Sequence, residues 1–418
     1  MSRLSVGVVF GGVSPEHEVS VITGLQAAAA LDRTRFAPVP VYVGKSGVWY
    51  TGEGLFEIAR YRDLNRVMAE ATPVHLARRE GGRAALVGPR RGLFGKPLEA
   101  EVDVLLLALH GGAGESGAVQ GLCEATGVPY TGSGVLGSAL GMDKVLTKML
   151  CRDQGIPVVD WVAFREHEWT GQEEARLDAL EAALAYPVVV KPARLGSSIG
   201  IAKADTRAEL DAAVEEALRY DDKIVVERAV APLREVNCAV LGTPHRARAS
   251  VIEEPVRTNG ERLLTFQEKY QRGGGKAGAG AGASGGGGSQ APRGAGAKGN
   301  GAAAGMASLD RLIPAPLPEA TADEVRRLAV LVFQLFECSG VARVDFLLDA
   351  EGRPYFNEIN TIPGSFSFYL WDPAGLPFDA LLGEMIEQAV ARYREEGGRI
   401  RSYETNLLAT ASFGGAKG

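Results

Sequence analysis

The chain has 418 residues, two to four times the length of a typical domain of roughly 100 to 200 residues, which predicts two or three domains. Apolar residues make up 46% and charged residues 23%, an ordinary globular composition that excludes a mostly disordered, collagenous or fibrous chain. The net charge of -6 excludes a whole-chain electrostatic attraction to nucleic acid or to an anionic membrane.

The first part of the chain has the pattern of an α/β domain. The apolar run Leu4–Phe10 predicts a strand, which two glycines and a helical stretch follow. The runs 39–43 and 102–109 predict further strands, with Trp49 in a turn between them. This alternation favours βαβ connectivity and a parallel sheet, in a unit that ends near Gly141.

A second, smaller unit should follow. Residues 142–150 have helical spacing, and the run 186–191 (YPVVVK) predicts a strand that ends in a charge. Residues 207–218 predict a helix and residues 224–227 a strand. We expect a central α+β lobe over residues 142–241.

Residues 273–305 contain 15 glycines and 10 alanines among 33 residues and no large apolar side chain. Such a segment cannot bury enough surface to offset its ordering entropy, so it predicts a disordered loop. Its charges, Lys276, Arg293 and Lys298, are all positive. A tolerated surface insertion is the favoured interpretation, because long loops add little closure entropy, and a role over anionic phosphates is the alternative.

The last part of the chain again predicts α+β structure. Residues 324–336 and 378–393 have helical periodicity. Residues 342–348 and 354–359 predict two strands joined by the turn 350–352. We expect this C-terminal lobe to cover residues 242–418.

The four cysteines lie far apart, without CxxC spacing, and indicate buried small residues in a reducing compartment. No stretch reaches 18 apolar residues, and only Arg3 precedes the first apolar run, so we expect no membrane span and no secretion signal. The expected location is the cytoplasm.

Two glycine-rich turns follow strands of the first unit. The first, Gly11-Gly12-Val13-Ser14, opens onto a helix and suits an anion, and the nearby Glu16 could hold a substrate ammonium group. The second, Leu109 to Gly121, begins with His110 at the carboxyl end of a strand, where open α/β sheets place ligands. A tight turn without function is the alternative for each.

The segment VVVKPARLGSSIGIAK places Lys191 at the end of a buried strand, before the small-residue loop Gly196-Ser197-Ser198. A lysine and several N–H and O–H donors suit phosphate oxygens. Lys144 and Lys269 also lie in glycine-rich or polar contexts. Solvated lysines beside a plain turn are the alternative.

The segment ARVDFLLDAEGRPYFNEINTIPG predicts a hairpin on which Asp345 faces the sequence NEIN. Glu358 and Asn360 are two residues apart and therefore point to the same face of their strand. Two carboxylates and an amide oxygen suit Mg²⁺ together with substrate phosphates. Arg343 lies next to this set and could balance its charge. A structural Asp/Glu pair on a solvated face of the sheet is the alternative.

These motifs together resemble the ATP-grasp ligases and, within them, the D-alanine–D-alanine ligases. The resemblance runs from about Val8 to about Pro373 and is interrupted by the Gly/Ala-rich insertion. The matching segments occur in the family's order: VVFGGVSPEHEVS, HGGAGESGAVQG, PYTGSGVLGSALGMDK, VVVKPARLGSSIGI, EKY, IPAP, ARVDF and NEINTIPG.

The resemblance implies a three-lobed ATP-grasp architecture of α/β and α+β units: an N-terminal parallel-sheet domain (1–141), a small central lobe (142–241) and a C-terminal catalytic lobe (242–418). It implies that ATP drives the joining of two D-alanines through an acyl phosphate, for peptidoglycan precursor synthesis. The implied cofactors are ATP and two Mg²⁺ ions, with Mn²⁺ as a substitute, and the implied assembly is a homodimer without nucleic acid or membrane partners.

The resemblance also implies roles for single residues. Glu16 would take the ammonium group of the first D-alanine, linked by hydrogen bonds to Ser197 and Tyr270. Arg343 and the backbone N–H of Gly364 would stabilise the tetrahedral oxyanion.

The other implied roles fall into three sets. The set around the substrates is His110, Lys269, Tyr369 and Leu370. The set around ATP is Lys144, Lys191, Ser198, Glu227 and Glu235. The set that would hold the metal ions is Asp345, Glu358 and Asn360.

The sequence departs from the family pattern at two places. The family usually has a serine for the carboxylate of the second D-alanine where this chain has Tyr369, and the insertion follows EKY, where the family's loop is compact. An ATP-grasp ligase with a different amino-acid or hydroxy-acid acceptor is therefore the nearest alternative. A dinucleotide-binding oxidoreductase would leave NEIN unexplained, and a non-catalytic nucleotide-binding module would not need Arg343 beside a metal pair.

Overall fold

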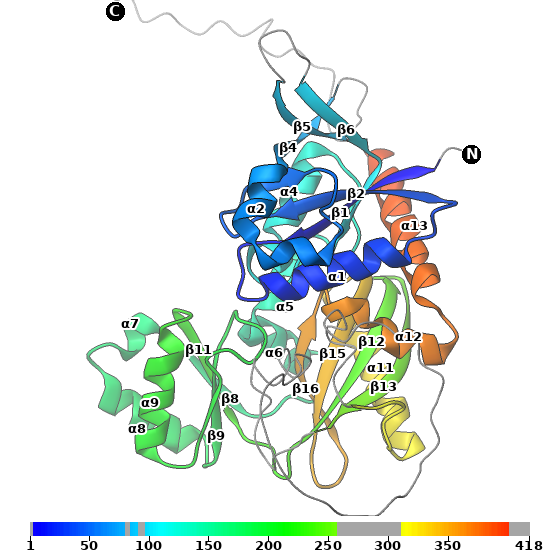
Figure 1. Ribbon diagram of the computed structural model, residues 1–418. Coiled ribbons are helices and arrows are strands. Elements are labelled where there is room, and N and C mark those ends of the chain that lie inside the picture. Colours follow the sequence, from blue (N-terminus) through cyan, green and yellow to red (C-terminus); the bar gives the residue numbers. More distant parts are fainter. Residues whose placement is uncertain (1–2, 80–83, 91–96, 257–310, 401–418) are drawn as a thin grey trace, which may run out of the picture.

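The computed structural model describes residues 3–79, 84–90, 97–256 and 311–400, which form three β-sheets with flanking helices (Figure 1). Lys269, Tyr270 and the Gly/Ala-rich insertion lie outside the described residues. The expected α/β and α+β class is confirmed.

The N-terminal sheet has seven strands in the order β6-β5-β4-β3-β2-β1-β7. The strands are β1 (Leu4–Gly11), β2 (Phe36–Val43), β3 (Trp49–Thr51), β4 (Thr72–Arg78), β5 (Ala84–Arg90), β6 (Pro97–Val102) and β7 (Val104–Leu107). The parallel part consists of β2, β1 and β7. The strands from β2 to β6 pair antiparallel in succession, so the sheet is mixed. Trp49, expected in a turn, instead begins β3.

Helices of the first part of the chain flank this sheet and lead towards the central lobe (Figure 1). They are α1 (His17–Ala30), the 3₁₀ helix η1 (Ile58–Arg62), α2 (Leu64–Glu70), α3 (Gly112–Glu115), α4 (Ala118–Thr126), α5 (Val135–Met142) and α6 (Lys144–Asp153). Helix α1 begins at His17, so Glu16 is its N-cap residue.

The central lobe contains a four-stranded sheet in the order β10-β9-β11-β8 and lies to one side of the molecule (Figure 1). Its elements are β8 (Trp161–Arg165), α7 (Glu166–Trp169), α8 (Glu173–Ala183), β9 (Val188–Pro192), β10 (Ala202–Ala204), α9 (Arg207–Leu218) and β11 (Lys223–Arg228). Helices α8 and α9 cover the sheet with apolar side chains such as Leu180 and Val214, which are buried.

The C-terminal sheet has five strands in the order β14-β13-β12-β15-β16. Its strands are β12 (Arg234–Thr243), β13 (Arg246–Pro255), β14 (Arg311–Leu312), β15 (Gly340–Leu348) and β16 (Pro354–Asn360). The accompanying helices are α11 (Glu319–Leu335), η3 (Gly364–Ser367), α12 (Phe368–Trp371), η4 (Asp372–Ala374) and α13 (Phe378–Gly397). Strand β12 belongs to this sheet and runs through residue 241, the expected end of the central lobe.

The N-terminal and C-terminal parts share a hydrophobic core. Buried side chains of β1 and β7 lie in one cluster with Leu241 of β12, Trp371 of α12 and Leu381 of α13. Helix α13 extends alongside both sheets (Figure 1). Because these parts bury apolar surface together, loops from both are held at a common junction.

Strands β13 and β14 bracket the undescribed residues 257–310. Pro255 of β13 is paired with Arg311 of β14, and Glu254 with Leu312. The chain therefore leaves the sheet and returns to it at neighbouring positions.

All four cysteines are buried and unpaired, as expected for small core residues. Burial raises the pKa of each of these thiols to about 12, which keeps them protonated and unreactive. No helix within the described ranges combines the length and apolarity that a membrane crossing requires.

Two helical glycines provide opposite tests of packing. A Cβ added at Gly24 of α1 would lie 2.4 Å from the Cβ of Phe10, whereas the nearest atom to a Cβ at Gly121 of α4 is 3.9 Å away, on Val135. Alanine favours a helix over glycine by about 1 kcal/mol, and overpacking costs about 1 to 3 kcal/mol. In urea unfolding, Gly24→Ala should lower the free energy of unfolding and Gly121→Ala should raise it. Equal effects of the two substitutions would contradict the tight contact between α1 and β1.

Candidate active site

The loops that follow β1 and β9 meet at Glu16. The hydroxyl of Ser197 donates a hydrogen bond to the Glu16 carboxylate, although the two residues are 181 positions apart. Ser197 and Ser198 both have left-handed backbones, with φ of 55° and 59°. The motifs predicted to act together are thus side by side at one junction.

Glycine is required in the loops around this carboxylate. A Cβ on Gly111 would lie 2.6 Å from Oε2 of Glu16, and one on Gly196 would lie 3.3 Å from the same atom. Gly111 also has a positive φ of 64°. Larger residues would therefore displace the Glu16 carboxylate from its place between the two loops.

His110 lies in the wall of the junction with both ring nitrogens bonded. Its Nδ1 is 2.8 Å from the carbonyl oxygen of Ile362, which can only accept, so Nδ1 carries the proton. Its Nε2 then accepts a hydrogen bond from the Thr23 hydroxyl at 2.8 Å. Burial lowers the pKa of His110 to about 4, and the charge of Arg343 acts in the same direction. His110 is thus neutral and ties the loop after β16 to α1.

Glu115 is a buried carboxylate at the same junction to which the sequence assigned no role. It accepts hydrogen bonds from the N–H of Gly111 at 3.1 Å and from the N–H of Ile362 at 3.0 Å, with the Thr361 hydroxyl 3.4 Å away. Burial raises the pKa of Glu115 to about 7, and the nearby charge of Glu16 acts in the same direction. Glu115 therefore joins the loop that carries His110 and Gly111, here called the histidine loop, to the loop after β16.

Lys144, at the start of α6, lies between the central and C-terminal lobes. Its Nζ donates to the carbonyl of Leu195 at 2.7 Å and is 3.2 Å from Oε2 of Glu358. A predicted phosphate-binding lysine thus contacts a predicted metal-binding carboxylate.

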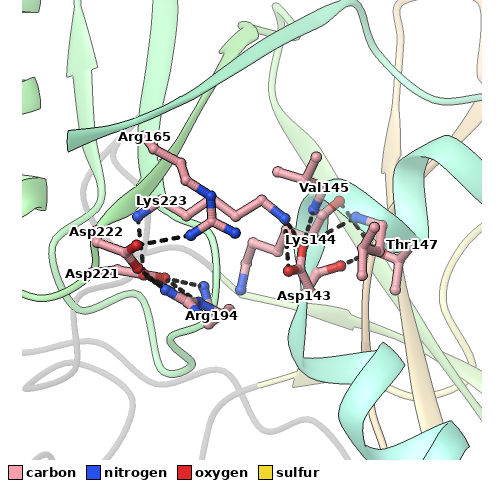
Figure 2. A network of polar contacts seen from close by, with 10 residues as sticks. Asp143, Lys144, Val145, Thr147, Arg165, Arg194, Asp221, Asp222 and Lys223 are labelled. Atoms are coloured by element: carbon pink, nitrogen blue, oxygen red, sulfur yellow. Dashed lines mark hydrogen bonds and ion pairs between the residues drawn. The ribbon is translucent and has the colours of Figure 1, made fainter. Parts of the chain in front are cut away.

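The start of α6 is fixed by a polar network (Figure 2). The Asp143 carboxylate caps the helix by accepting two backbone N–H bonds from its first turn, at 3.0 and 3.1 Å. Lys223 of β11 donates to both oxygens of that carboxylate, at 2.9 and 2.7 Å (Figure 2). The N–H of Lys144 also donates to the carbonyl of Ala193 at 3.0 Å. The central sheet therefore sets the position of Lys144.

Lys191, on β9, is buried and bonded on two sides. Its Nζ donates to Glu227 at 2.8 Å and to Oδ1 of Asn357 on β16 at 2.9 Å. The resemblance assigns Glu227 to the adenine side of ATP, and in this structure its carboxylate also pairs with Lys191. Lys191 is also a bridge between the central and C-terminal sheets.

The β15–β16 hairpin carries the predicted metal set on one face. Asp345 is paired with Glu358 and Arg343 with Asn360 across the two strands. Arg343 donates to both oxygens of Asp345, each at 2.7 Å, and Nδ2 of Asn360 donates to Asp345 at 3.1 Å. The period-two pattern of the sequence thus predicted this constellation correctly.

This carboxylate set fits a hard divalent cation. Burial raises the pKa of Asp345 to about 6, and the charges of Glu358 and Glu235 act in the same direction, against Arg343. Within the described ranges no group of three or more His, Cys, Asp or Glu side chains has metal-site geometry. Two carboxylates and one amide suit Mg²⁺, because this ion keeps several waters and takes further oxygens from phosphates.

Tyr369 lies in a buried polar cluster that the sequence did not predict. Its hydroxyl is 3.3 Å from Oε1 of Glu253, which also accepts from Asn237 at 3.1 Å. The Arg311 guanidinium lies 3.9 Å from the centre of the tyrosine ring and pairs with Glu253 at 2.5 Å. The hydroxyl thus faces a protein carboxylate, and the neighbouring Leu370 side chain is buried in the core.

The segment after Gly364 has an unusual backbone. Ser365, Phe366 and Ser367 all have φ near 50°, in the left-handed region that costs non-glycine residues about 1 to 3 kcal/mol each. Hydrogen bonds to α1 hold the turn: Ser365 donates its N–H to Thr23 at 3.1 Å and its hydroxyl to Gln26 at 2.7 Å. Helix α1 therefore fixes the course of the chain directly after Gly364.

Comparisons with known proteins show similarity to one family over most of the chain. The family model for the D-ala D-ala ligase N-terminus matches residues 5–133, and that for the D-ala D-ala ligase C-terminus matches residues 150–282 and 304–387. The chain is 34% identical to a D-alanine–D-alanine ligase of Thermosipho melanesiensis over 406 residues, 97% of this chain and 98% of that protein.

Two solved structures are similar over nearly their whole length. The D-alanine-D-alanine ligase from Coxiella burnetii has a TM-score of 0.74 and 28% identity, covering 98% of this chain and 100% of its own. The VanG D-Ala:D-Ser ligase from Enterococcus faecalis has a TM-score of 0.71 and 27% identity, covering 93% of this chain and 100% of its own.

The raised pKa of Glu115 makes the fold sensitive to pH. The pKa of this carboxyl rises from 4.5 to about 7 on folding, because the folded protein favours the protonated form. Its contribution to the free energy of unfolding is therefore present in full below pH 4.5 and is lost as the pH rises through 7. Relative to Glu115→Gln, the wild type should therefore lose about 3 kcal/mol of unfolding free energy between pH 4.5 and 7.5. Urea unfolding at several pH values measures the difference, and parallel pH profiles of the two proteins would contradict it.

Proposed function

The chain belongs to the D-alanine–D-alanine ligase family, and on that premise we propose that it joins two D-alanines in an ATP-dependent reaction that releases ADP and phosphate. It is an ADP-forming carbon–nitrogen ligase that supplies a dipeptide for peptidoglycan synthesis. The observation that carries this proposal is the 3.2 Å contact between Lys144 and Glu358, which pairs a lysine predicted to bind phosphate with a carboxylate predicted to bind metal, between two lobes.

The first half of the reaction makes an acyl phosphate. The ammonium group of the first D-alanine binds Glu16, which Ser197 holds and which Tyr270 would also contact. The substrate carboxylate then attacks the terminal phosphate of ATP, and ADP leaves. Lys144 and Lys191 neutralise the phosphate oxygens. The burial of Lys191 and the glycine contacts of Glu16 support these roles, because both groups are held before substrates arrive.

The second half forms the peptide bond. The amine of the second D-alanine attacks the acyl phosphate, and the tetrahedral oxyanion is stabilised by Arg343 and by the N–H of Gly364 before phosphate leaves. Support comes from the bidentate pair that holds Arg343 beside Asp345. His110 supports the wall of the first substrate site, and Lys269 would contact a substrate carboxylate.

Asp345, Glu358 and Asn360 would hold Mg²⁺, with Mn²⁺ as a substitute. Two ions bound there would neutralise charge on the ATP phosphates. The mutual repulsion of the carboxylates supports this assignment.

Three further residues would complete the nucleotide-binding site. Ser198 would contact the phosphates, and Glu227 and Glu235 would lie towards the adenosine. The left-handed backbone at Ser198 and the proximity of Glu235 to the carboxylate set support these positions. We propose three lobes as predicted, with β12 assigned to the C-terminal one.

We also propose a cytoplasmic homodimer. Six of the thirteen exposed large apolar side chains within the described ranges lie on α4, α5 and α6 or at their ends, which a second copy of the chain could cover. They are Leu122, Val135, Leu136, Leu146, Met149 and Leu150.

A second candidate function differs only in the acceptor. The Tyr369 hydroxyl faces Glu253 and its ring lies against Arg311. This side chain fills more space than the serine that the family usually has at this position. A different amino acid, such as the D-serine named for the Enterococcus ligase, or a hydroxy acid would then replace the second D-alanine.

One experiment separates these functions. ADP release is measured with D-alanine as donor and with D-alanine, D-serine, L-amino acids or D-lactate as acceptor, and the product mass is determined. D-alanyl-D-alanine as the main product at millimolar D-alanine supports the proposal. Turnover only with another acceptor would overturn it in favour of the second candidate.

Glu358→Gln should reduce ADP release by about 100-fold or more, because it removes an anionic oxygen from a magnesium site with few protein ligands. Glu351→Gln, in the exposed turn of the same hairpin, is the matched control and should leave turnover within about two-fold. Near-normal ADP release by Glu358→Gln with Mg²⁺ and D-alanine would refute the metal assignment.

Tyr369→Phe should raise the Michaelis constant for the second D-alanine about three- to ten-fold and change the turnover number little, because it loosens a pocket wall by one hydrogen bond. Tyr355→Phe is the control, since its hydroxyl makes an equivalent 3.3 Å contact with Asp349 on the edge of the same sheet. A fall in turnover number without a change in the Michaelis constant would place Tyr369 outside the acceptor pocket.

A further inference from the structure

Lys148 is a fully buried cation to which the proposed reaction gives no role. It lies one turn after Lys144 on α6, with no solvent exposure of its side chain. Its Nζ is 3.1 Å from Oε1 of Glu227 and has no well-aligned hydrogen-bond partner within the described ranges. An ammonium group buried in this way is costly, so its presence needs a compensating interaction.

Glu227 is shared by two lysines. Its Oε2 accepts from Lys191 at 2.8 Å, while its Oε1 faces Lys148. Burial would raise the pKa of Glu227, but the two ammonium groups outweigh it and lower the pKa to about 2. The carboxylate is therefore ionised at any pH at which the protein works.

The charges of this cluster do not cancel. With both amines protonated, Lys148, Lys191 and Glu227 together carry one net positive charge, and each is at least 94% buried. Burial lowers the pKa of Lys148, and the carboxylate of Glu227 opposes this by favouring the charged amine. A lysine paired with a single carboxylate presents only a dipole to an approaching anion. Because Lys148 neutralises the charge of Glu227, the electrostatic potential that Lys191 presents to an anion remains positive.

We propose that Lys148 is a positioning residue that neutralises Glu227, so that the charge of Lys191 stays available for the phosphates of the nucleotide. This inference rests on the proposed ATP-binding role of Lys191. It extends that function, because Lys148 acts without touching the nucleotide.

Counting charges predicts the effect of removing the amine. Lys148→Met leaves a neutral Lys191–Glu227 pair, so the empty protein should unfold at a similar urea concentration to the wild type. Nucleotide binding should weaken instead, about 10-fold or more for ATP and less for AMP, because the lost field acts on the phosphates. The Michaelis constant for ATP should rise while those for the D-alanines stay unchanged.

The double variant Lys148→Met/Glu227→Gln restores one net positive charge through Lys191 alone. The ratio of its ATP affinity to its AMP affinity should recover to within about three-fold of the wild-type ratio, because a contact of Glu227 with the adenosine contributes to both nucleotides. Lys203→Met is the control, because this exposed lysine of the same lobe pairs with Asp205 at 3.0 Å and should leave affinity unchanged.

The test measures the dissociation constants of ATP, ADP and AMP by calorimetry, with urea unfolding of each variant. Unchanged ATP affinity in Lys148→Met, or equal losses for ATP and AMP, would overturn the inference. If Lys148→Met does not unfold cooperatively, the double variant decides, and a fall in its ratio of ATP to AMP affinity below the wild-type ratio would overturn the inference. A wild type that binds no ATP would refute the proposed function itself, and with it the premise of the inference.

Discussion

The cost of burying charge where the three sheets meet governs the architecture of this protein. Ionised or ionisable side chains that are at most 8% exposed there include Glu115, Lys144, Lys148, Lys191, Glu227, Glu253, Arg343 and Asp345. An unpaired charge in such a place would cost several kcal/mol, so each partner must be held at a defined position. Accurate placement of loops from distant parts of the chain follows from this requirement.

The hydrogen bonds and ion pairs of these buried side chains connect each lobe to a neighbouring lobe. Lys191 joins the central sheet to Asn357 of the C-terminal hairpin, and Glu115 joins the N-terminal histidine loop to Ile362. The same side chains pair with one another and, in the proposed function, flank the substrates. A change in the contacts between the lobes would therefore also change the charges that surround the substrates. A shared apolar core beneath the N-terminal and C-terminal sheets supplies the rigid support for these polar contacts.

The sequence was informative where a short-range pattern determines the structure. The alternation in the NEIN strand predicted the face shared by Glu358 and Asn360, and the strand ending at Lys191 was placed within two residues. It was uninformative where partners lie far apart, as for Glu115 and Ile362, which are separated by 247 positions. Tyr369 signalled a departure from the family, but its partners Arg311 and Glu253 became evident only through the pairing of β13 with β14.

The pairing of Pro255 with Arg311 has a consequence for how this chain can vary. The chain between Pro255 and Arg311 begins and ends one strand spacing apart, whatever its length. Each doubling of the length of a loop adds only about 0.6 kcal/mol to the free energy of closing it. Related lineages could lengthen or shorten this stretch without rerouting the fold. The same position is a natural host site for a reporter domain, because a guest whose own termini lie close together would enter the chain without separating the two strands.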